Sequence, residues 1–190
     1  FINEIDKQTL LNSNIIFTSG VGNHQMYMAQ LMTFTRPGQW YSSGSLGDMN
    51  CGMSYPIGCQ IANPDKTIIA IIGDGCFNMG IGELLTIKRY KLPIKIFIDN
   101  NMSLNMVKCW ENLFYNGNNV ATKLNNPDYK GIIESYNIKC ISIHDKKYLK
   151  NGIKETLEYN NGPVICIINT IQDYCYPLVK PGGDIDDIVV

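Results

Sequence analysis

Two short apolar runs, each followed by polar residues or glycine, stand out in the pattern of hydrophobic and polar positions. The first, Ile68 to Ile72, leads into Gly73-Asp74-Gly75, and the second, a mostly apolar run from Ile94 to Ile98, leads into Asp99-Asn100-Asn101. Such runs are typical of strands buried on both faces, as in parallel sheets. Between them, residues 77–91 carry apolar side chains at helical spacing ahead of Pro93, namely Ile81, Leu84, Leu85 and Ile87. The pattern therefore predicts a strand, a helix and a second strand.

The rest of the chain divides in the same way. We expect further strands at 15–17, 39–43, 138–143 and 163–168, and further helices at 3–12, 24–34, 50–62, 103–115, 128–136 and 146–159. Pro56 makes the helix at 50–62 a candidate for interruption. Beyond Thr170 the sequence has no clear period, and we expect a tail over the sheet edge. The expectation is a single α/β domain spanning residues 1–190, with a doubly wound, six-stranded, mainly parallel sheet and helices on both faces.

Polar side chains follow both strands of the central unit. Because neighbouring parallel strands end at the same edge of the sheet, we expect Asp74 and Asn101 to lie side by side there, where α/β sheets bind ligands. Carboxylate and amide oxygens suit Mg²⁺, which usually shares its coordination shell with phosphates and water. Gly73 and Gly75 let the backbone approach a phosphate closely, and the amides of Cys76 and Phe77 are candidate anion donors at the next helix start. The alternative is an ordinary turn and strand cap.

Composition narrows the classes of function. A chain of 190 residues with 45% hydrophobic content suits one well-cored domain, and a net charge of −1 without a basic run gives no indication of nucleic acid or a membrane surface as partner. No apolar stretch has transmembrane length, and residues 1–6 lack the pattern of a signal peptide. We expect a cytoplasmic protein, with an organelle left open because the chain opens mid-pattern, like a piece of something longer.

Seven cysteines are scattered along the chain without a CxxC pair, and the only histidines are His24 and His144. This pattern argues against a zinc site, and the odd count makes a complete disulfide framework impossible. We therefore expect reduced, mostly buried thiols.

Several stretches together resemble one enzyme family. They are SGVGNHQMYMAQ from Ser19, SSGSLGDM from Ser42, GDGCFNMGIGEL from Gly73, YKLPIKI from Tyr90 and NN-x-x-L-N-M-V-x-x-W from Asn100, and the ending from Gly162, GPVICII and then YPLVKPGG, is also similar. The GDG…NN pattern resembles the signature of thiamine diphosphate (ThDP) enzymes. The whole set resembles the C-terminal ThDP-binding domain of acetolactate synthase (acetohydroxyacid synthase), catalytic large subunit.

The resemblance implies a domain that holds ThDP through Mg²⁺. By position, the metal ligands are Asp74, the side chain of Asn101 and the backbone carbonyl of Ser103. Asn23 and His24 match positions beside the diphosphate, although for His24 a structural role at a helix start is the alternative. The other cofactor-binding positions are Gly22, Gly47, Met49, Gly73, Gly75, Cys76, Leu104, Asn105 and Met106.

Met49 and Trp110 are catalytic candidates by the same resemblance. Met49 matches the apolar wedge that bends ThDP, so that its 4′-amino group, bonded to the Gly47 carbonyl, lies near thiazolium C2. Trp110 matches the tryptophan that favours the larger second keto acid, and the alternative is that it belongs to a core stripe. The implied reaction decarboxylates pyruvate and joins the two-carbon fragment to a second 2-keto acid, as in branched-chain amino acid biosynthesis.

The chain departs from the family pattern at three places. Asn105 stands where the family usually has glycine, Asn23 replaces a more common glutamine, and Asn50 to Tyr55 replaces a smaller and more apolar stretch. The departure at Asn105 puts the approach of this loop to the cofactor in doubt. None of the three removes a metal ligand.

The resemblance also implies domains that this chain does not contain. The pyrimidine-binding domain with its activating glutamate would come from a partner subunit in a homodimer or larger assembly, and FAD is expected only in a missing middle domain. A regulatory small subunit is a further partner in the family. Alone, the chain is expected to be catalytically incomplete. Two alternatives stay open, namely another ThDP-dependent 2-keto acid decarboxylase or lyase, and a non-catalytic relic of the family.

Overall fold

The apolar runs of the chain form one parallel sheet in the computed structural model, which describes residues 1–10, 12–176, 178–180, 182–184 and 186–189. Its six strands have the order β2-β1-β3-β4-β6-β5, and every neighbouring pair is parallel. They are β1 (Ile15–Ser19), β2 (Trp40–Tyr41), β3 (Thr67–Gly73), β4 (Lys95–Asn100), β5 (Lys139–Ile143) and β6 (Val164–Asn169). The predicted fold class is confirmed, since all six expected strands are present.

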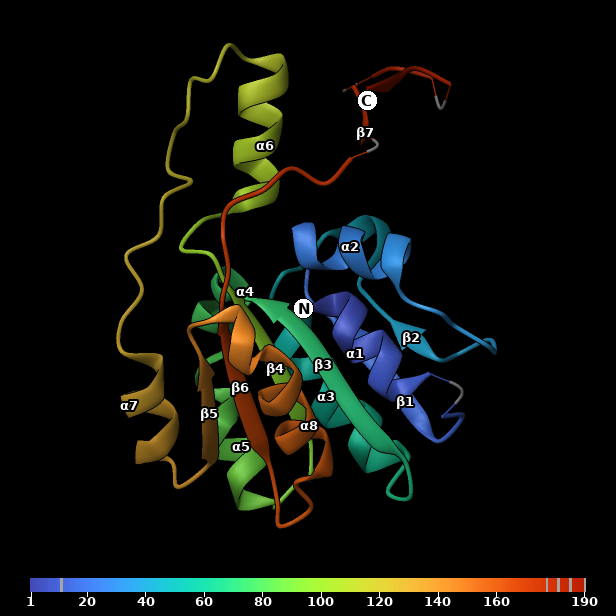
Figure 1. Cartoon of the computed structure of the whole chain (residues 1–190), viewed down its shortest axis with the longest axis vertical. Coiled ribbons are helices and arrows are strands. Elements are labelled where there is room, and N and C mark those ends of the chain that lie inside the picture. The colour runs from blue at the N-terminus through green and yellow to red at the C-terminus, as the bar shows by residue number, and fades with distance from the viewer. Residues whose placement is uncertain (11, 177, 181, 185, 190) are drawn as a thin grey trace.

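Helices cover both faces of this sheet (Figure 1). Alternate residues of a strand point to opposite faces, so Ile68, Ala70 and Ile72 of β3 pack with one group of helices, and Ile69 and Ile71 pack with the other. The first group is α3 (Cys51–Ala62), α4 (Asp74–Gly80), α5 (Glu83–Arg89) and α7 (Tyr129–Ser135). The second is α1 (Ile2–Thr9), α2 (Asn23–Leu31) and α8 (Leu149–Glu158). This double burial explains why the central strands lack a polar face.

The central helix differs from its prediction. Instead of one helix over 77–91, the chain forms α4, which begins at Asp74, and α5, with the break at Ile81 and Gly82. A side chain at Gly80 would lie 2.5 Å from Cβ of Met53, so the end of α4 packs directly on α3. The interruption expected at Pro56 is absent, because α3 continues through this residue, which is buried against the core. Leu85, one of the apolar residues in that helical pattern, is 63% exposed and lies outside the core.

Other boundaries shift by a few residues. The helix expected at 3–12 ends at Thr9, and position 11 lies outside the described residues. Lys95, the charged residue within the apolar run at 94–98, is buried as part of β4. Its Nζ donates to the carbonyl of Tyr159. Short 3₁₀ turns at Gly44–Leu46 and Lys146–Tyr148 precede α3 and α8.

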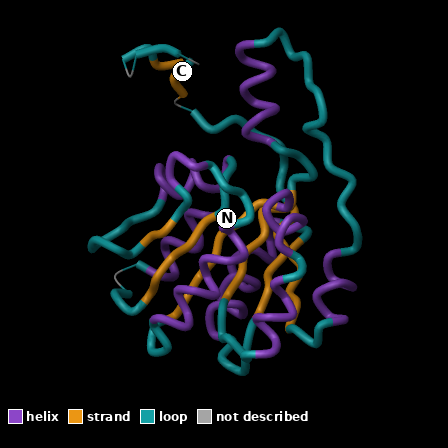
Figure 2. Tube along the Cα trace, turned by 180° about the vertical axis from the view of Figure 1, so that it is seen from behind, coloured by secondary structure: helices purple, strands orange, loops and turns teal. Residues whose placement is uncertain are grey.

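Two segments project past the carboxyl edge of the sheet. Figures 1 and 2 show α6 (Asn105–Phe114) and the C-terminal segment beyond the same end of the strands. The expected tail is confirmed, because the amide of Thr170 donates to the Asn100 carbonyl at 3.1 Å and Nε2 of Gln172 donates to the Asn101 carbonyl at 3.1 Å. The end of the chain adds a small antiparallel pair, β7 (Leu178–Val179) and β8 (Ile188–Val189).

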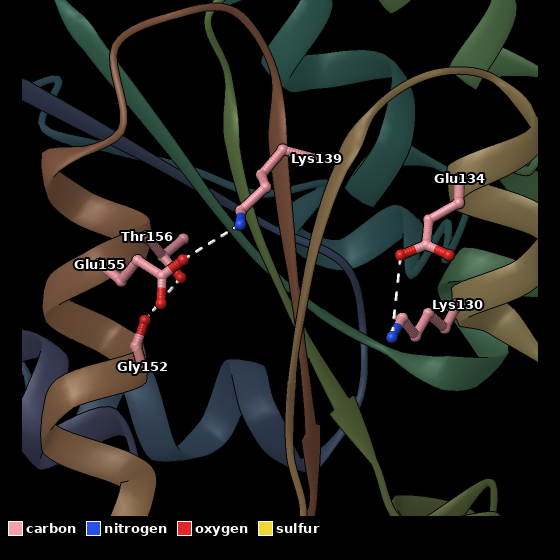
Figure 3. Close-up of polar contacts among 6 residues, drawn as sticks. All are labelled: Lys130, Glu134, Lys139, Gly152, Glu155 and Thr156. Carbon is pink, nitrogen blue, oxygen red and sulfur yellow. Dashed lines mark hydrogen bonds and ion pairs between the residues drawn. The ribbon is translucent and has the colours of Figure 1, made fainter.

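Ion pairs lie on the surface at α7 and α8, the two helices that pack next to β5. Lys139 of β5 reaches Glu155 of α8 at 3.2 Å, and Lys130 reaches Glu134 within α7 at 3.8 Å (Figure 3). These side chains are exposed, so each pair contributes at most about 1 kcal/mol and the buried faces carry the stability. All seven cysteines are free thiols, as expected. Among the described residues, no helix is long and apolar enough to cross a membrane.

Candidate functional site

The central strand–helix–strand unit brings Asp74 and Asn101 to one edge of the sheet. Strands β3 and β4 pair in parallel, with Gly73 opposite Asp99, so the residues that follow the two strands leave the sheet together. Asp74 and Asn101 are both buried and both line a pocket of about 480 Å³ at this edge. The structure therefore places the two predicted ligand side chains at a common cavity.

Three strand-to-helix turns and one loop line this pocket. The turn after β1 supplies Val21, Gly22, Asn23 and His24, the turn after β3 supplies Gly73 to Cys76, and the segment after β4 supplies Asn101 and residues 103–107. Met49 reaches the pocket from the loop before α3. Every position that the resemblance gives to cofactor binding lines the pocket except Gly47, which lies in the preceding turn with φ of 62°. Phe77, whose amide was a candidate anion donor, lies inside α4 in the core and does not line the pocket.

The Asp74 carboxylate is held by three donors. Its Oδ2 accepts from the amide of Met102 at 2.7 Å and from Nδ2 of Asn126 at 2.7 Å, whereas its Oδ1 accepts a single hydrogen bond within the described part of the chain, from the amide of Gly75 at 2.9 Å. Burial raises the pKa of Asp74 above its ordinary value, and these hydrogen bonds oppose the shift. Because a carboxylate has about four lone-pair positions, Oδ1 retains an acceptor position for a cation.

The turn after β4 is shaped around Asn101 and Ser103. Oδ1 of Asn101 accepts from the amide of Ser103 at 3.0 Å, and Ser103 Oγ donates to the Thr122 carbonyl at 3.2 Å. Met102 between them has φ of 56°, a conformation that non-glycine residues rarely adopt. Since Met102 also donates to Asp74, this turn couples the two strand ends.

His24 is buried at the start of α2 and lines the pocket. Burial lowers its pKa to about 4, with a smaller opposing effect of the Gly20 backbone, so the imidazole is neutral near pH 7. Its Nε2 has no hydrogen-bond partner within the described part of the chain. A buried polar nitrogen in this state costs free energy unless a ligand or water pairs with it. This nitrogen faces Gly20, whereas the Nδ1 side of the ring faces Gly22 and Gly73, which line the pocket.

Gly75 brings the backbone close to Met49 and Leu104. A Cβ atom at Gly75 would lie 2.7 Å from Cδ2 of Leu104 and 2.9 Å from Cε of Met49. Both contacts are with the ends of flexible side chains that line the pocket. A side chain at this position would therefore push into the cavity before it disturbed the backbone.

We expect Gly75→Ala to weaken by ~10-fold the binding of the ThDP that the family resemblance implies, because overpacking of a well-packed site costs typically ~1–3 kcal/mol. Gly82→Ala is the matched control, since a Cβ atom there meets nothing within 4 Å. Calorimetric titration of ThDP into the full-length protein with saturating Mg²⁺ measures both variants. Equal affinities for the two variants would contradict this account of Gly75.

At two of the positions that depart from the family pattern, the side chain bonds to the C-terminal segment. Nδ2 of Asn23 and Nδ2 of Asn105 both donate to the carbonyl of Asp173, at 2.9 Å and 2.7 Å. Asn105 therefore uses its side chain to hold this segment beside the pocket. Nothing in the sequence indicates this contact, because the region beyond Thr170 has no period that marks its path.

Asn126 makes a second set of contacts that the sequence did not indicate. It lies in the loop before α7, and its amide bonds both Asp74 and Asn100. The only signal was its place at the end of an asparagine-rich loop, which identifies no partner.

Trp110 lies on α6 outside the pocket, with its ring 5.5 Å from that of Phe114. It is half-buried and belongs to neither hydrophobic core cluster of the described residues. The structure thus places Trp110 apart from both the cavity and the core, and its role in choosing a second substrate stays a prediction.

Known proteins resemble this chain over nearly its whole length. Residues 20–168 match the family described as thiamine pyrophosphate enzyme, C-terminal TPP binding domain. Acetolactate synthase 1, chloroplastic, from Zea mays is 36% identical over 189 residues, which is 95% of this chain and 30% of the relative. The acetolactate synthase large subunit from Porphyra purpurea is 36% identical over 176 residues, which is 90% of this chain and 29% of the relative. The chain therefore spans less than a third of the length of these relatives.

Proposed function

The chain belongs to the thiamine pyrophosphate enzymes, as a C-terminal TPP binding domain, and from this membership we propose that the full protein is an acetolactate synthase. The observation that carries the proposal is the pocket, because motif residues shared with that family line it from four separate segments. The similarity to acetolactate synthases over 95% of the chain supports the same assignment. Residues 1–190 would form one domain of the full protein.

The residues at the edge fit Mg²⁺. The metal would take Oδ1 of Asp74, the side-chain oxygen of Asn101 and the backbone carbonyl of Ser103, with diphosphate oxygens and water completing the shell. Among the described residues, no group of three or more His, Cys, Asp or Glu side chains could hold a metal. A single carboxylate with neutral oxygens suits a cation that arrives with a diphosphate, since the phosphates bring most of the negative charge.

The rest of the pocket would hold ThDP itself. Neutral His24 and Asn23 would lie beside the diphosphate end, and Gly73 and Gly75 would allow close approach of the backbone. Met49 would fill the space between the two rings, and the Gly47 carbonyl would accept from the amino group. When bound, ThDP supplies the carbon that attacks a keto group and stabilises the charge left by loss of CO₂.

The proposed substrates are pyruvate and a second 2-keto acid. The activating glutamate would come from the pyrimidine domain of a partner subunit, so the working enzyme would be a homodimer or larger assembly. FAD would belong to a middle domain outside this chain, and a regulatory small subunit is a further proposed partner. The pocket described above would then be one half of the active site.

Product analysis of the full-length protein tests the proposal. With pyruvate, ThDP and Mg²⁺, we expect acetolactate and CO₂. Acetaldehyde without acetolactate would indicate a different ThDP-dependent decarboxylase or lyase. The absence of any ThDP binding in a calorimetric titration with Mg²⁺ would instead indicate a non-catalytic relative.

We also expect Trp110→Leu to lower the preference of the full protein for 2-ketobutyrate over pyruvate as second substrate, with ThDP affinity unchanged. Because Trp110 lies outside the pocket that would hold the cofactor, its substitution should not change the affinity for ThDP. Competition between the two keto acids, with both products quantified, measures the preference. An unchanged product ratio would remove Trp110 from substrate selection.

A further inference from the structure

Asn126 joins the two strand ends that carry the proposed metal ligands. Its Nδ2 donates to Oδ2 of Asp74 at 2.7 Å, directly after β3, and to Oδ1 of Asn100 at 2.9 Å, at the end of β4 and next to Asn101. A side-chain amide has two N–H donors, and Asn126 uses one toward each strand. It therefore links Asp74 to the strand end that carries Asn101.

The orientation of this amide is itself controlled. Nδ2 of Asn78 donates to Oδ1 of Asn126 at 3.0 Å, and the hydroxyl of Tyr129 donates to Oδ1 of Asn78 at 2.9 Å. Tyr129 is buried, with its ring packed edge-on against Phe77 at 5.0 Å. Because each group donates to the next, the series Tyr129, Asn78 and Asn126 ends with an N–H directed at Asp74. The other orientation would set the carbonyl oxygen of Asn126 against the Asp74 carboxylate.

This arrangement makes the two oxygens of Asp74 unequal. Oδ2 accepts from both Met102 and Asn126, and these two bonds use both of its lone-pair positions. Among the described residues, Oδ1 accepts from Gly75 alone. A cation at the pocket would therefore meet a carboxylate with one oxygen available. Mg²⁺ demands near-ideal octahedral geometry, whereas Ca²⁺ accepts one or both oxygens of a carboxylate at longer distances.

We propose that Asn126 is a positioning residue for the metal. By donating to Oδ2 of Asp74, Asn126 leaves Oδ1 as the single oxygen of this carboxylate that can bind the metal, and this arrangement favours Mg²⁺ over Ca²⁺. This inference rests on the proposed function, since it concerns the metal that would accompany ThDP. Asn126 belongs to the loop before α7 and does not itself line the pocket, so it would act on the metal only through Asp74.

The test is a competition experiment on the full-length protein with saturating ThDP. Mn²⁺ is the probe, followed by the loss of the electron paramagnetic resonance signal of the free ion, and Mg²⁺ or Ca²⁺ displaces it. Asn126→Leu keeps the size of the side chain but removes both donors. We expect its Mg²⁺ affinity to fall by ~10–100-fold, the range typical of partners that orient metal ligands. Its Ca²⁺ affinity should fall less, so the ratio of the two affinities decreases.

Two further variants keep the result interpretable. Asn125→Leu is the matched control, because Asn125 is the exposed neighbour of the half-buried Asn126, and it should behave as wild type. Asn78→Leu, at an exposed position, should lower the same ratio by a smaller factor because it only releases the orientation of Asn126. Asn78→Leu therefore tests the positioning role of Asn126 even if Asn126→Leu does not fold.

Three outcomes are distinguishable. A lower Mg²⁺-to-Ca²⁺ ratio in Asn126→Leu and Asn78→Leu supports the positioning role. Unchanged affinities, or equal losses for both cations together with a lower melting temperature, overturn it. Failure of the wild-type protein to bind Mn²⁺ with ThDP would overturn the proposed function instead.

Discussion

Asp74→Asn is expected to lower the affinity of the full-length protein for Mg²⁺, in the presence of ThDP, by more than ~100-fold. The substitution keeps the size of the side chain and removes the only charged ligand proposed at the edge of the sheet. Loss of a partner that merely orients a ligand costs ~10–100-fold in metal affinity, so loss of the ligand charge should cost more. Since the diphosphate would be held through the metal, ThDP binding should weaken in parallel.

The Mn²⁺ competition described for Asn126 measures this effect. Asp65→Asn is the matched control, because Asp65 is exposed in the turn before β3. Without metal, the melting temperature of Asp74→Asn should fall modestly, because the amide has one acceptor oxygen for donors that now bond two, while removal of a buried charge offsets part of this loss. An unchanged Mg²⁺ affinity would remove Asp74 from the metal site.

Leu84→Ala is expected to reduce the free energy of unfolding by ~2–5 kcal/mol, the range for truncation of a buried leucine that leaves a cavity. Leu84 is 0% exposed on α5, where it packs in the core cluster that includes Phe77 and Ile87. Leu85→Ala is the matched control one residue along the same helix. Because Leu85 is 63% exposed, its truncation should change the free energy of unfolding by at most ~0.5 kcal/mol.

Denaturant unfolding of the two variants in parallel measures the difference. The comparison holds residue type, helix and size of the truncation constant, so only burial differs. Similar losses for Leu84→Ala and Leu85→Ala would mean that the exposed face of α5 is covered in the full protein, which would contradict the assignment of Leu85 to the surface.

The sheet was predictable because its signal is local. Five consecutive apolar residues before Gly73 identify β3 as a strand buried on both faces, and the turn residues follow directly in the sequence. Asp74 and Asn101 were expected together on the same grounds, since parallel neighbours end at one edge. The family resemblance then extended the site to His24 and Met49, and both line the pocket.

Other features depended on contacts that no local period reveals. The apolar spacing over 77–91 predicted one helix, but Gly80 lies where the end of α4 packs against α3, and the helix divides just after it, at Ile81 and Gly82. Leu85 fits the same period as Leu84, yet a helix turns 100° per residue and only one of the pair meets the core. Which of these two adjacent leucines is buried was decided by the side of α5 that packs on the core.

By itself, the sequence determined the parallel α/β sheet, the edge at which ligands gather and most of the residues that line the pocket. The sheet and its ligand edge follow from short apolar runs and the turns that end them, whereas most of the pocket residues were identified through the family resemblance of the sequence. Only the tertiary structure decided that Asn126 bonds Asp74, that Asp173 receives Asn23 and Asn105, and that Trp110 lies outside the pocket. Those contacts join residues far apart in the chain, and the loops that bring them together follow paths set by the packed core.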